Sequence, residues 1–167
     1  MQGTFRGEKR QRFDAKGRVS IPSTFRKVLD AGDPDRDSGE DPNLIIVHGD
    51  KGRKFLEGFT QVAHDRKAAQ IARMKGEPKR MFTRLFLMQS SDMRVDSTGR
   101  IVLPKELRDK LGLGESGELV FAGAGETFQI WNAETYDAEM GEPDITALDG
   151  VEEGMDMNDA FELFAED

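Results

Sequence analysis

One segment of this 167-residue chain occurs twice. Residues 13–29 read FDAKGRVSIPSTFRKVL, and residues 95–111, 82 positions later, read VDSTGRIVLPKELRDKL. Six of the sixteen positions from Asp14 to Leu29 are identical in the second copy, and three further pairs are conservative apolar exchanges: Val19/Ile101, Ile21/Leu103 and Phe25/Leu107. A repeat of this kind marks a repeated structural unit, so the chain must fold as two related units.

Each copy contains the same order of structural signals. In the first copy, Asp14 can accept a hydrogen bond from the backbone two residues on, and Gly17 tolerates a positive φ, which together predict a tight turn. A short strand over residues 18–21 follows, and Pro22 then ends the strand and suits the first turn of a helix. The second copy repeats these signals from Asp96 onward.

Further strands are predicted after each helix. They lie at residues 44–47, 54–56, 118–121 and 127–131. Each unit is then β-turn-β-α-β-β in about 45 residues, which is too few to bury an adequate core alone. We therefore expect an α+β fold in which the two units pack against each other. The expected segments are a first unit at 5–57, a helical linker at 58–90, a second unit at 91–136 and an acidic tail at 137–167.

Charge is distributed unevenly along the chain. The net charge is −8, but residues 134–167 contain thirteen acidic residues and no Lys or Arg, so residues 1–133 carry +5. This asymmetry suggests a body that binds a polyanion, followed by an acidic tail. The alternative is that the basic residues only solvate a surface. We expect the tail to be mostly disordered, with NDAFELFAE near its end able to form a short amphipathic docking helix.

Several classes of site find no support in the sequence. The absence of cysteine excludes disulfides, a cysteine nucleophile and thiolate metal sites. His48 and His64 lack the partners of a metal site or a catalytic triad, and GLGESG (112–117) follows a predicted helix where a dinucleotide fingerprint would follow a strand. We expect no enzyme activity, cofactor, metal or small-molecule substrate. Without an apolar leader or spanning segment, we expect a cytoplasmic, nucleoid-associated protein with no membrane partner.

The duplicated motif resembles the MraZ family of bacterial transcriptional regulators, which have two tandem domains of the AbrB/SpoVT type. The resemblance lies in FDAKGRVSIPSTFR, VDSTGRIVLPKELR and the later run LVFAGAGETFQIWNAETY, and covers about residues 1–137. It implies a swapped-hairpin fold in which the two units form a pseudo-dimer. It also implies ring-shaped homo-oligomers that bind repeated DNA elements upstream of the division and cell-wall gene cluster. The acidic loop at 32–43, the polar helix in the 60s and the long acidic tail depart from the family pattern.

The resemblance also indicates candidate site residues. It makes Arg18 and Arg100 the expected DNA contacts, and arginine suits bidentate contact with guanine as well as with phosphate. The alternative is that each arginine only pairs with its own aspartate and closes the turn. The residues expected to shape the turns and orient these arginines are Asp14, Gly17, Asp96 and Gly99.

Additional basic residues distinguish the first copy. Because Lys9, Arg10, Arg12 and Lys16 outnumber Arg94 of the second copy, we expect the first copy to dominate contact with DNA phosphates. A ring that offers several units to promoter repeats would gain selectivity through effective concentration. The alternative function is an antitoxin-like module that binds a partner protein. The tail argues against it, because its apolar residues are sparse.

Overall fold

The structure is a computed structural model that describes residues 3–166. The first copy of the repeat forms four strands and one helix. Phe25 and Leu29 lie one turn apart on the helix and are fully buried, so this helix is held by a single apolar face. In chain order the elements are β1 (Glu8–Phe13), β2 (Arg18–Ser20), α1 (Ser23–Ala31), β3 (Asn43–Val47) and β4 (Phe55–Phe59).

The second copy forms the same elements in the same order. Its helix is shorter and buries Leu107, the counterpart of Phe25. The expected α+β class is confirmed. These elements are β5 (Ser90–Arg94), β6 (Arg100–Val102), α4 (Lys105–Lys110), β7 (Gly117–Gly123) and β8 (Thr127–Asn132).

Helices connect the two copies, as expected, but their limits differ from the expected linker. Strand β4 continues to Phe59, two residues past the expected end of the first unit. Thr60 then caps α2, because its hydroxyl accepts a hydrogen bond from the Ala63 amide at 3.0 Å. The linking helices are α2 (Gln61–Ala72), α3 (Gly76–Thr83) and a π-helical turn, Arg84–Met88.

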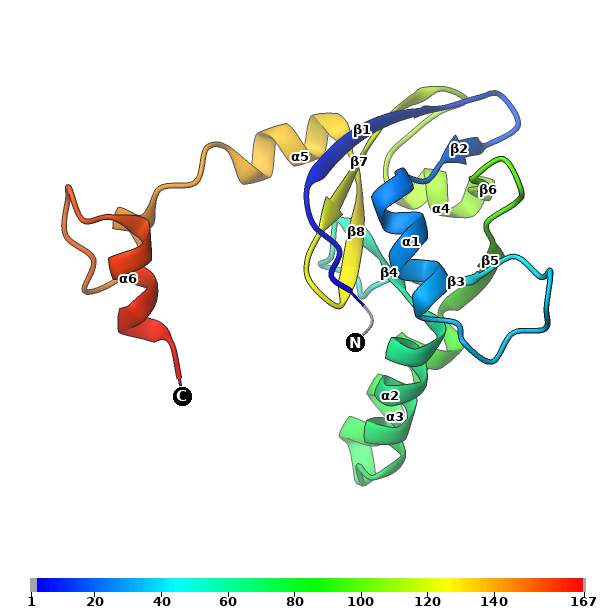
Figure 1. Cartoon of the computed structure of the whole chain (residues 1–167), viewed down its shortest axis with the longest axis horizontal. Helices are drawn as coiled ribbons and strands as arrows, with labels where there is room; N and C mark the ends of the chain where they lie inside the picture. Colours follow the sequence, from blue (N-terminus) through cyan, green and yellow to red (C-terminus); the bar gives the residue numbers. More distant parts are fainter. Residues whose placement is uncertain (1–2, 167) are drawn as a thin grey trace. The chain divides into compact units, whose positions relative to one another are not determined.

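The six-stranded antiparallel sheet exchanges strands between the copies (Figure 1). Its order is β1-β7-β8-β4-β3-β5. Strand β1 of the first copy pairs with β7 of the second, and β5 of the second copy pairs with β3 of the first. Hairpins β3-β4 and β7-β8 meet through β4 and β8 at the centre. Each copy therefore gives its first strand to the hairpin of the other.

The remaining two strands form a separate ladder. Strands β2 and β6 pair antiparallel, with Val19 opposite Ile101 at the centre. Both central residues are buried, and their neighbours on either side face outward. This β2/β6 ladder joins the two copies at equivalent positions, so it lies on the approximate two-fold axis that relates them.

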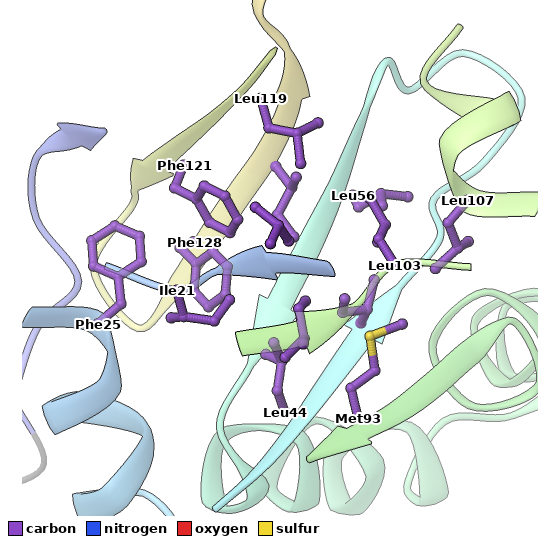
Figure 2. Close-up of a cluster of buried hydrophobic side chains, with 14 of the residues drawn as sticks. Ile21, Phe25, Leu44, Leu56, Met93, Leu103, Leu107, Leu119, Phe121 and Phe128 are labelled. Atoms are coloured by element: carbon purple, nitrogen blue, oxygen red, sulfur yellow. The ribbon is translucent and has the colours of Figure 1, made fainter. Parts of the chain in front are cut away.

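One hydrophobic core serves both copies (Figure 2). The Phe25 ring of α1 lies 5.1 Å from the Phe128 ring of β8, and Leu44 and Leu56 of the first copy belong to the same cluster as Phe121 of the second. Burying such side chains contributes about 1.5–3 kcal/mol each. The sharing of one core explains why the unit occurs in duplicate.

The opposite face of the sheet carries a smaller apolar cluster. Helix α5 (Ala133–Met140) begins directly after β8, and its Tyr136 ring packs edge-on against Trp131 at 5.5 Å. The Phe55 ring stacks on Trp131 at 4.9 Å. This cluster covers one part of that face, and Ile45, Val47 and Phe59 form another with residues of the linking helices.

The chain divides into two compact units, Met1–Tyr136 and Asp137–Asp167. The described part of the second unit contains a 3₁₀ turn (Ile145–Ala147) and helix α6 (Met157–Phe164). The expected helix near the end of the tail is present, while the expectation of a largely disordered tail is not confirmed. Among the described residues, none of the helices combines the length and the apolar character needed to cross a membrane.

Candidate nucleic-acid interface

The first turn, between β1 and β2, is organised by Asp14. One carboxylate oxygen, Oδ1, accepts hydrogen bonds from the backbone amides of Lys16 and Arg18, both at 2.9 Å. The other, Oδ2, accepts from Arg18 Nε at 2.7 Å. Gly17 has a φ of 79°, which a residue with a side chain rarely adopts. The turn thus fixes the direction in which Arg18 leaves the backbone.

The second turn, between β5 and β6, repeats this pattern with one difference. Asp96 Oδ1 accepts from the amides of Thr98 and Arg100, both at 2.9 Å, and Gly99 has a φ of 80°. Arg100 Nε, however, donates to Thr98 Oγ1 at 3.0 Å and lies 3.9 Å from Asp96 Oδ2. The Thr98 hydroxyl itself donates to Asp96 at 2.7 Å. Arg100 is therefore oriented through Thr98.

Both turns favour the ionised form of their aspartate. The pKa of Asp14 is lowered from its ordinary value of 3.8, chiefly because the carboxylate accepts the Arg18 amide. The pKa of Asp96 is also lowered from 3.8, chiefly by the Arg100 amide and then by the Thr98 hydroxyl. Both carboxylates are therefore charged at neutral pH and hold their turns through charge-assisted hydrogen bonds.

Each turn is also supported by the other copy. The Leu103 amide donates to the Gly17 carbonyl at 2.7 Å, and the Ile21 amide donates to the Gly99 carbonyl at 2.8 Å. The Arg108 guanidinium donates to the Leu103 carbonyl at 3.1 Å, beside the first turn, and its counterpart Arg26 lies against Gly99. Neither arginine was among the predicted site residues. Arg26 and Arg108 are one of the identical pairs of the repeat, and this identity could have indicated that both support the turns.

The β2/β6 ladder brings the two predicted DNA contacts onto one surface. Arg18 lies opposite Val102, and Ser20 lies opposite Arg100, with all four side chains on the outward face. Arg18 and Arg100 are therefore diagonal neighbours, about 7–8 Å apart at the backbone. Their side chains are 39% and 37% exposed. The two turns consequently present a single paired surface, not two separate ones.

Each of these arginines keeps its outer edge available. Within residues 3–166, the side-chain hydrogen bonds of Arg18 and Arg100 use only Nε, and both terminal nitrogens of each guanidinium lack an acceptor. The arrangement is compatible with both interpretations of the sequence, the structural ion pair and the DNA contact. Nε of each guanidinium is held by its own turn, while the terminal nitrogens have no acceptor and the side chain is partly exposed. An oriented guanidinium of this kind can donate two parallel hydrogen bonds to a base edge or a phosphate.

The other basic residues predicted to contact DNA lie in three different settings. Lys16 is exposed at the tip of the first turn. Arg10 and Arg12 approach Glu118 of β7 at 3.3 and 3.9 Å, so part of their charge is already balanced. Lys9 alternates with them and therefore lies on the opposite face of β1. Counting basic residues in the sequence could not reveal that Glu118 lies opposite Arg12 and within reach of Arg10.

Comparison with known proteins places these turns in a family context. A family model described as "Antidote-toxin recognition MazE, bacterial antitoxin" matches residues 93–123, which include the second turn. Over 141 residues the chain is 52% identical to "Transcriptional regulator MraZ" of Ruegeria pomeroyi, covering 83% of each chain. The chain belongs to the MraZ family.

Two further MraZ relatives extend the comparison. The protein of Ruegeria sp. is 45% identical over 141 residues, again covering 83% of each chain. That of Rhodospirillum rubrum is 32% identical over 152 residues, covering 88% of this chain and 92% of the relative. The name that these relatives bear, "Transcriptional regulator MraZ", is that of a regulatory protein.

Proposed function

We propose that this MraZ-family chain is a transcriptional regulator that binds DNA in a sequence-specific manner through the β2/β6 ladder. Arg18 and Arg100 contact base edges, and Lys16 contacts a phosphate beside them. Asp14 and Asp96 orient the arginines, while Gly17 and Gly99 permit the turns. The proposed targets are repeated elements upstream of the division and cell-wall gene cluster.

One observation carries the proposal. Two guanidinium groups with free terminal nitrogens lie on the outward face of one antiparallel ladder, each anchored at Nε by its own turn. A two-stranded ribbon fits the major groove of DNA, and arginine pairs bidentately with guanine there. Anchoring lowers the entropy that each arginine would lose on binding, so the surface is preorganised for recognition.

The exchanged strands support a further part of the proposal. We propose that they represent the swapped-hairpin pseudo-dimer of AbrB-type domains, within one chain, and that several chains assemble into a ring. Each ladder binds one short element weakly, whereas a ring that engages several repeats gains affinity through effective concentration. The regulatory outcome, repression or activation, is a separate property of the promoter.

The test is DNA binding by the full chain. We expect the wild-type protein to bind a duplex from upstream of its own gene more tightly than a scrambled duplex, with affinity that falls steeply as salt rises. The double variant R18A/R100A should lose this preference while keeping its circular dichroism spectrum and oligomer size. A wild-type protein that binds both duplexes equally, or not at all, would refute sequence-specific recognition.

A second candidate is an antitoxin-like module that binds a partner protein. The MazE match over residues 93–123 and the exposed apolar residues of α6 favour it, among them Met157, Phe161 and Phe164. On this alternative, R18A/R100A would leave biological activity intact, whereas truncation before α6 would abolish it. The reverse pattern supports the DNA-binding function.

A further inference from the structure

A basic hollow lies beside the first copy's helix. It has a volume of about 700 Å³, opens between residues 3–9 and α1, and is lined by the basic side chains of Arg6, Lys9 and Lys27. All three residues are exposed, and none forms an ion pair with a carboxylate within residues 3–166. This basic hollow therefore concentrates positive charge that the described part of the chain does not balance.

The walls of the basic hollow are held in place by packing. Phe5, which precedes Arg6, is 1% exposed, and its ring lies 5.3 Å from the Phe25 ring of α1 and 4.9 Å from that of Phe128. Its backbone also exchanges two hydrogen bonds with Gly125, at 2.8 and 3.1 Å. The segment that carries Arg6 is thus fixed relative to the helix that carries Lys27, so an anion would bind a preformed surface.

The start of α1 adds to this positive surface. Thr24, in the first turn, lines the basic hollow with its neighbour Lys27 one turn later, and the first turn contains no acidic residue. The unpaired amides at the start of a helix carry partial positive charge and can donate to phosphate oxygens. The Thr24 hydroxyl and the start of α1 therefore supplement the three cations that define the basic hollow.

The second copy lacks an equivalent surface. Its helix α4 has the acidic residue Glu106 in its first turn, and Asp109 pairs with Lys105 at 3.2 Å. The two copies have equivalent turns and both contribute to the ladder, but only the first copy has the basic hollow. The residues 82 positions after Arg6, Lys9, Thr24 and Lys27 are Met88, Ser91, Glu106 and Asp109.

We infer that the basic hollow binds a backbone phosphate beside the DNA element read by the ladder, and so fixes the direction in which each subunit lies on the duplex. The inference rests on the proposed function. The ladder alone is nearly two-fold symmetric, so it would accept an element in either direction. Thr24 lies four residues past Ser20, at most about 13 Å along the chain, which suits a phosphate at the edge of a groove about 12 Å wide.

Removing the three cations tests the inference. The variant R6A/K9A/K27A should bind the upstream duplex about tenfold more weakly at low salt, and the slope of log affinity against log salt should fall by about 1 for each phosphate that the variant no longer neutralises. The preference for the upstream over the scrambled duplex should remain. The matched control R73A/K75A/K79A removes three exposed cations from α3 and from the connection between α2 and α3, and should change affinity less than twofold.

A footprint on the DNA shows in which direction each subunit lies on the duplex, whereas an affinity does not. Phosphate-ethylation interference on the wild-type complex should reveal contacts on one side of each element that disappear in R6A/K9A/K27A. The reciprocal variant E106T/D109K places the first copy's residues on α4. It should raise affinity and add contacts on the other side of the element.

The outcomes separate the inference from the proposed function. If the wild-type protein shows no preference for the upstream duplex, the proposed function fails, and the inference fails with it. If the wild-type protein binds specifically but R6A/K9A/K27A behaves like wild type or like the control, only the inference fails. A wild-type footprint that extends equally to both sides of the element would also overturn it.

Discussion

The two turns of this molecule have nearly the same backbone but hold their arginines differently. Arg18 contacts the carboxylate of Asp14 directly at 2.7 Å, whereas Arg100 reaches Asp96 through the hydroxyl of Thr98. A charge-assisted contact is roughly twice as strong as one between neutral groups. Two copies of one motif can therefore hold the same side chain with different rigidity. Arg18 is oriented more firmly than Arg100.

Substituting the turn glycines should have the largest effect. A Cβ on Gly17 would lie 2.6 Å from the Leu103 carbonyl, which is backbone and also accepts from Arg108, so it cannot move easily. Gly17→Ala should lower the free energy of unfolding by about 2–3 kcal/mol. At Gly99 the obstacle is the flexible Arg26 side chain, and Gly99→Ala should cost about 1–2 kcal/mol.

Urea denaturation followed by circular dichroism measures both values, provided that unfolding is two-state. Equal losses for the two variants would contradict the distinction between a rigid and a flexible neighbour. A neutral Gly17→Ala would show that the turn relaxes more freely than its close approach to Leu103 suggests.

Removing the aspartates should affect DNA binding next most strongly. Asp14→Ala frees Arg18 completely, and ordering a free long side chain on binding costs about 0.5–1.5 kcal/mol, so specific affinity should fall up to about tenfold. Asp96→Ala should cost less, because Thr98 still accepts from Arg100. Fluorescence anisotropy with the upstream duplex measures both, with the scrambled duplex as control. A larger loss for Asp96→Ala would reverse the proposed ranking.

Removing the bridging hydroxyl isolates the difference between the copies. Thr98→Val keeps the size of the side chain but leaves Arg100 Nε without its acceptor, so specific affinity should fall about threefold, within the range for one hydrogen bond. The matched control is Thr146→Val, since Thr146 makes the same two bonds to Asp144, at 2.9 and 2.7 Å, outside the ladder. Equal affinities for the two variants would show that Thr98 does not orient Arg100 for binding.

Acid should weaken both turns by a small amount. Since the pKa values of Asp14 and Asp96 are lowered from 3.8, their contribution to stability is full above that pH and is lost as the pH falls below it through the folded-state values. Asp14→Asn should therefore reduce the dependence of unfolding free energy on pH in this range. Carboxyl NMR titration checks the direction, and a pKa of 3.8 or higher for Asp14 would contradict the hydrogen-bonding scheme.

Much of the local structure could be predicted from the repeat. Asp14, Gly17 and Pro22 carry turn and helix signals that depend only on nearby backbone, and these signals predicted the first turn, the short strand after it and the helix that follows. The pairing of β1 with β7 and of β5 with β3 could not be derived from these patterns, because a local pattern does not say which distant strand will be the partner. The family resemblance predicted a swapped hairpin, which stays a proposal, and register is decided by packing across the whole core.

The charge surface was predicted less well, for a different reason. Counting Lys9, Arg10 and Arg12 together ignored strand alternation, which places Arg10 and Arg12 beside Glu118 and Lys9 on the other face. The basic hollow combines Lys9 with Lys27, eighteen positions away, and only the fold brings them together. The tail was expected to be largely disordered from its composition, yet α6 and a 3₁₀ turn form within it.

The most direct test of the central claim is the specificity of Arg18→Lys. This variant keeps the positive charge but lacks the planar guanidinium that Asp14 orients, so it separates base recognition from attraction to phosphate. We predict that the ratio of upstream to scrambled affinity falls at least tenfold while the salt dependence is unchanged, with a smaller fall for Arg100→Lys. A variant that retains the wild-type ratio would contradict the claim that oriented arginines on the β2/β6 ladder read the DNA.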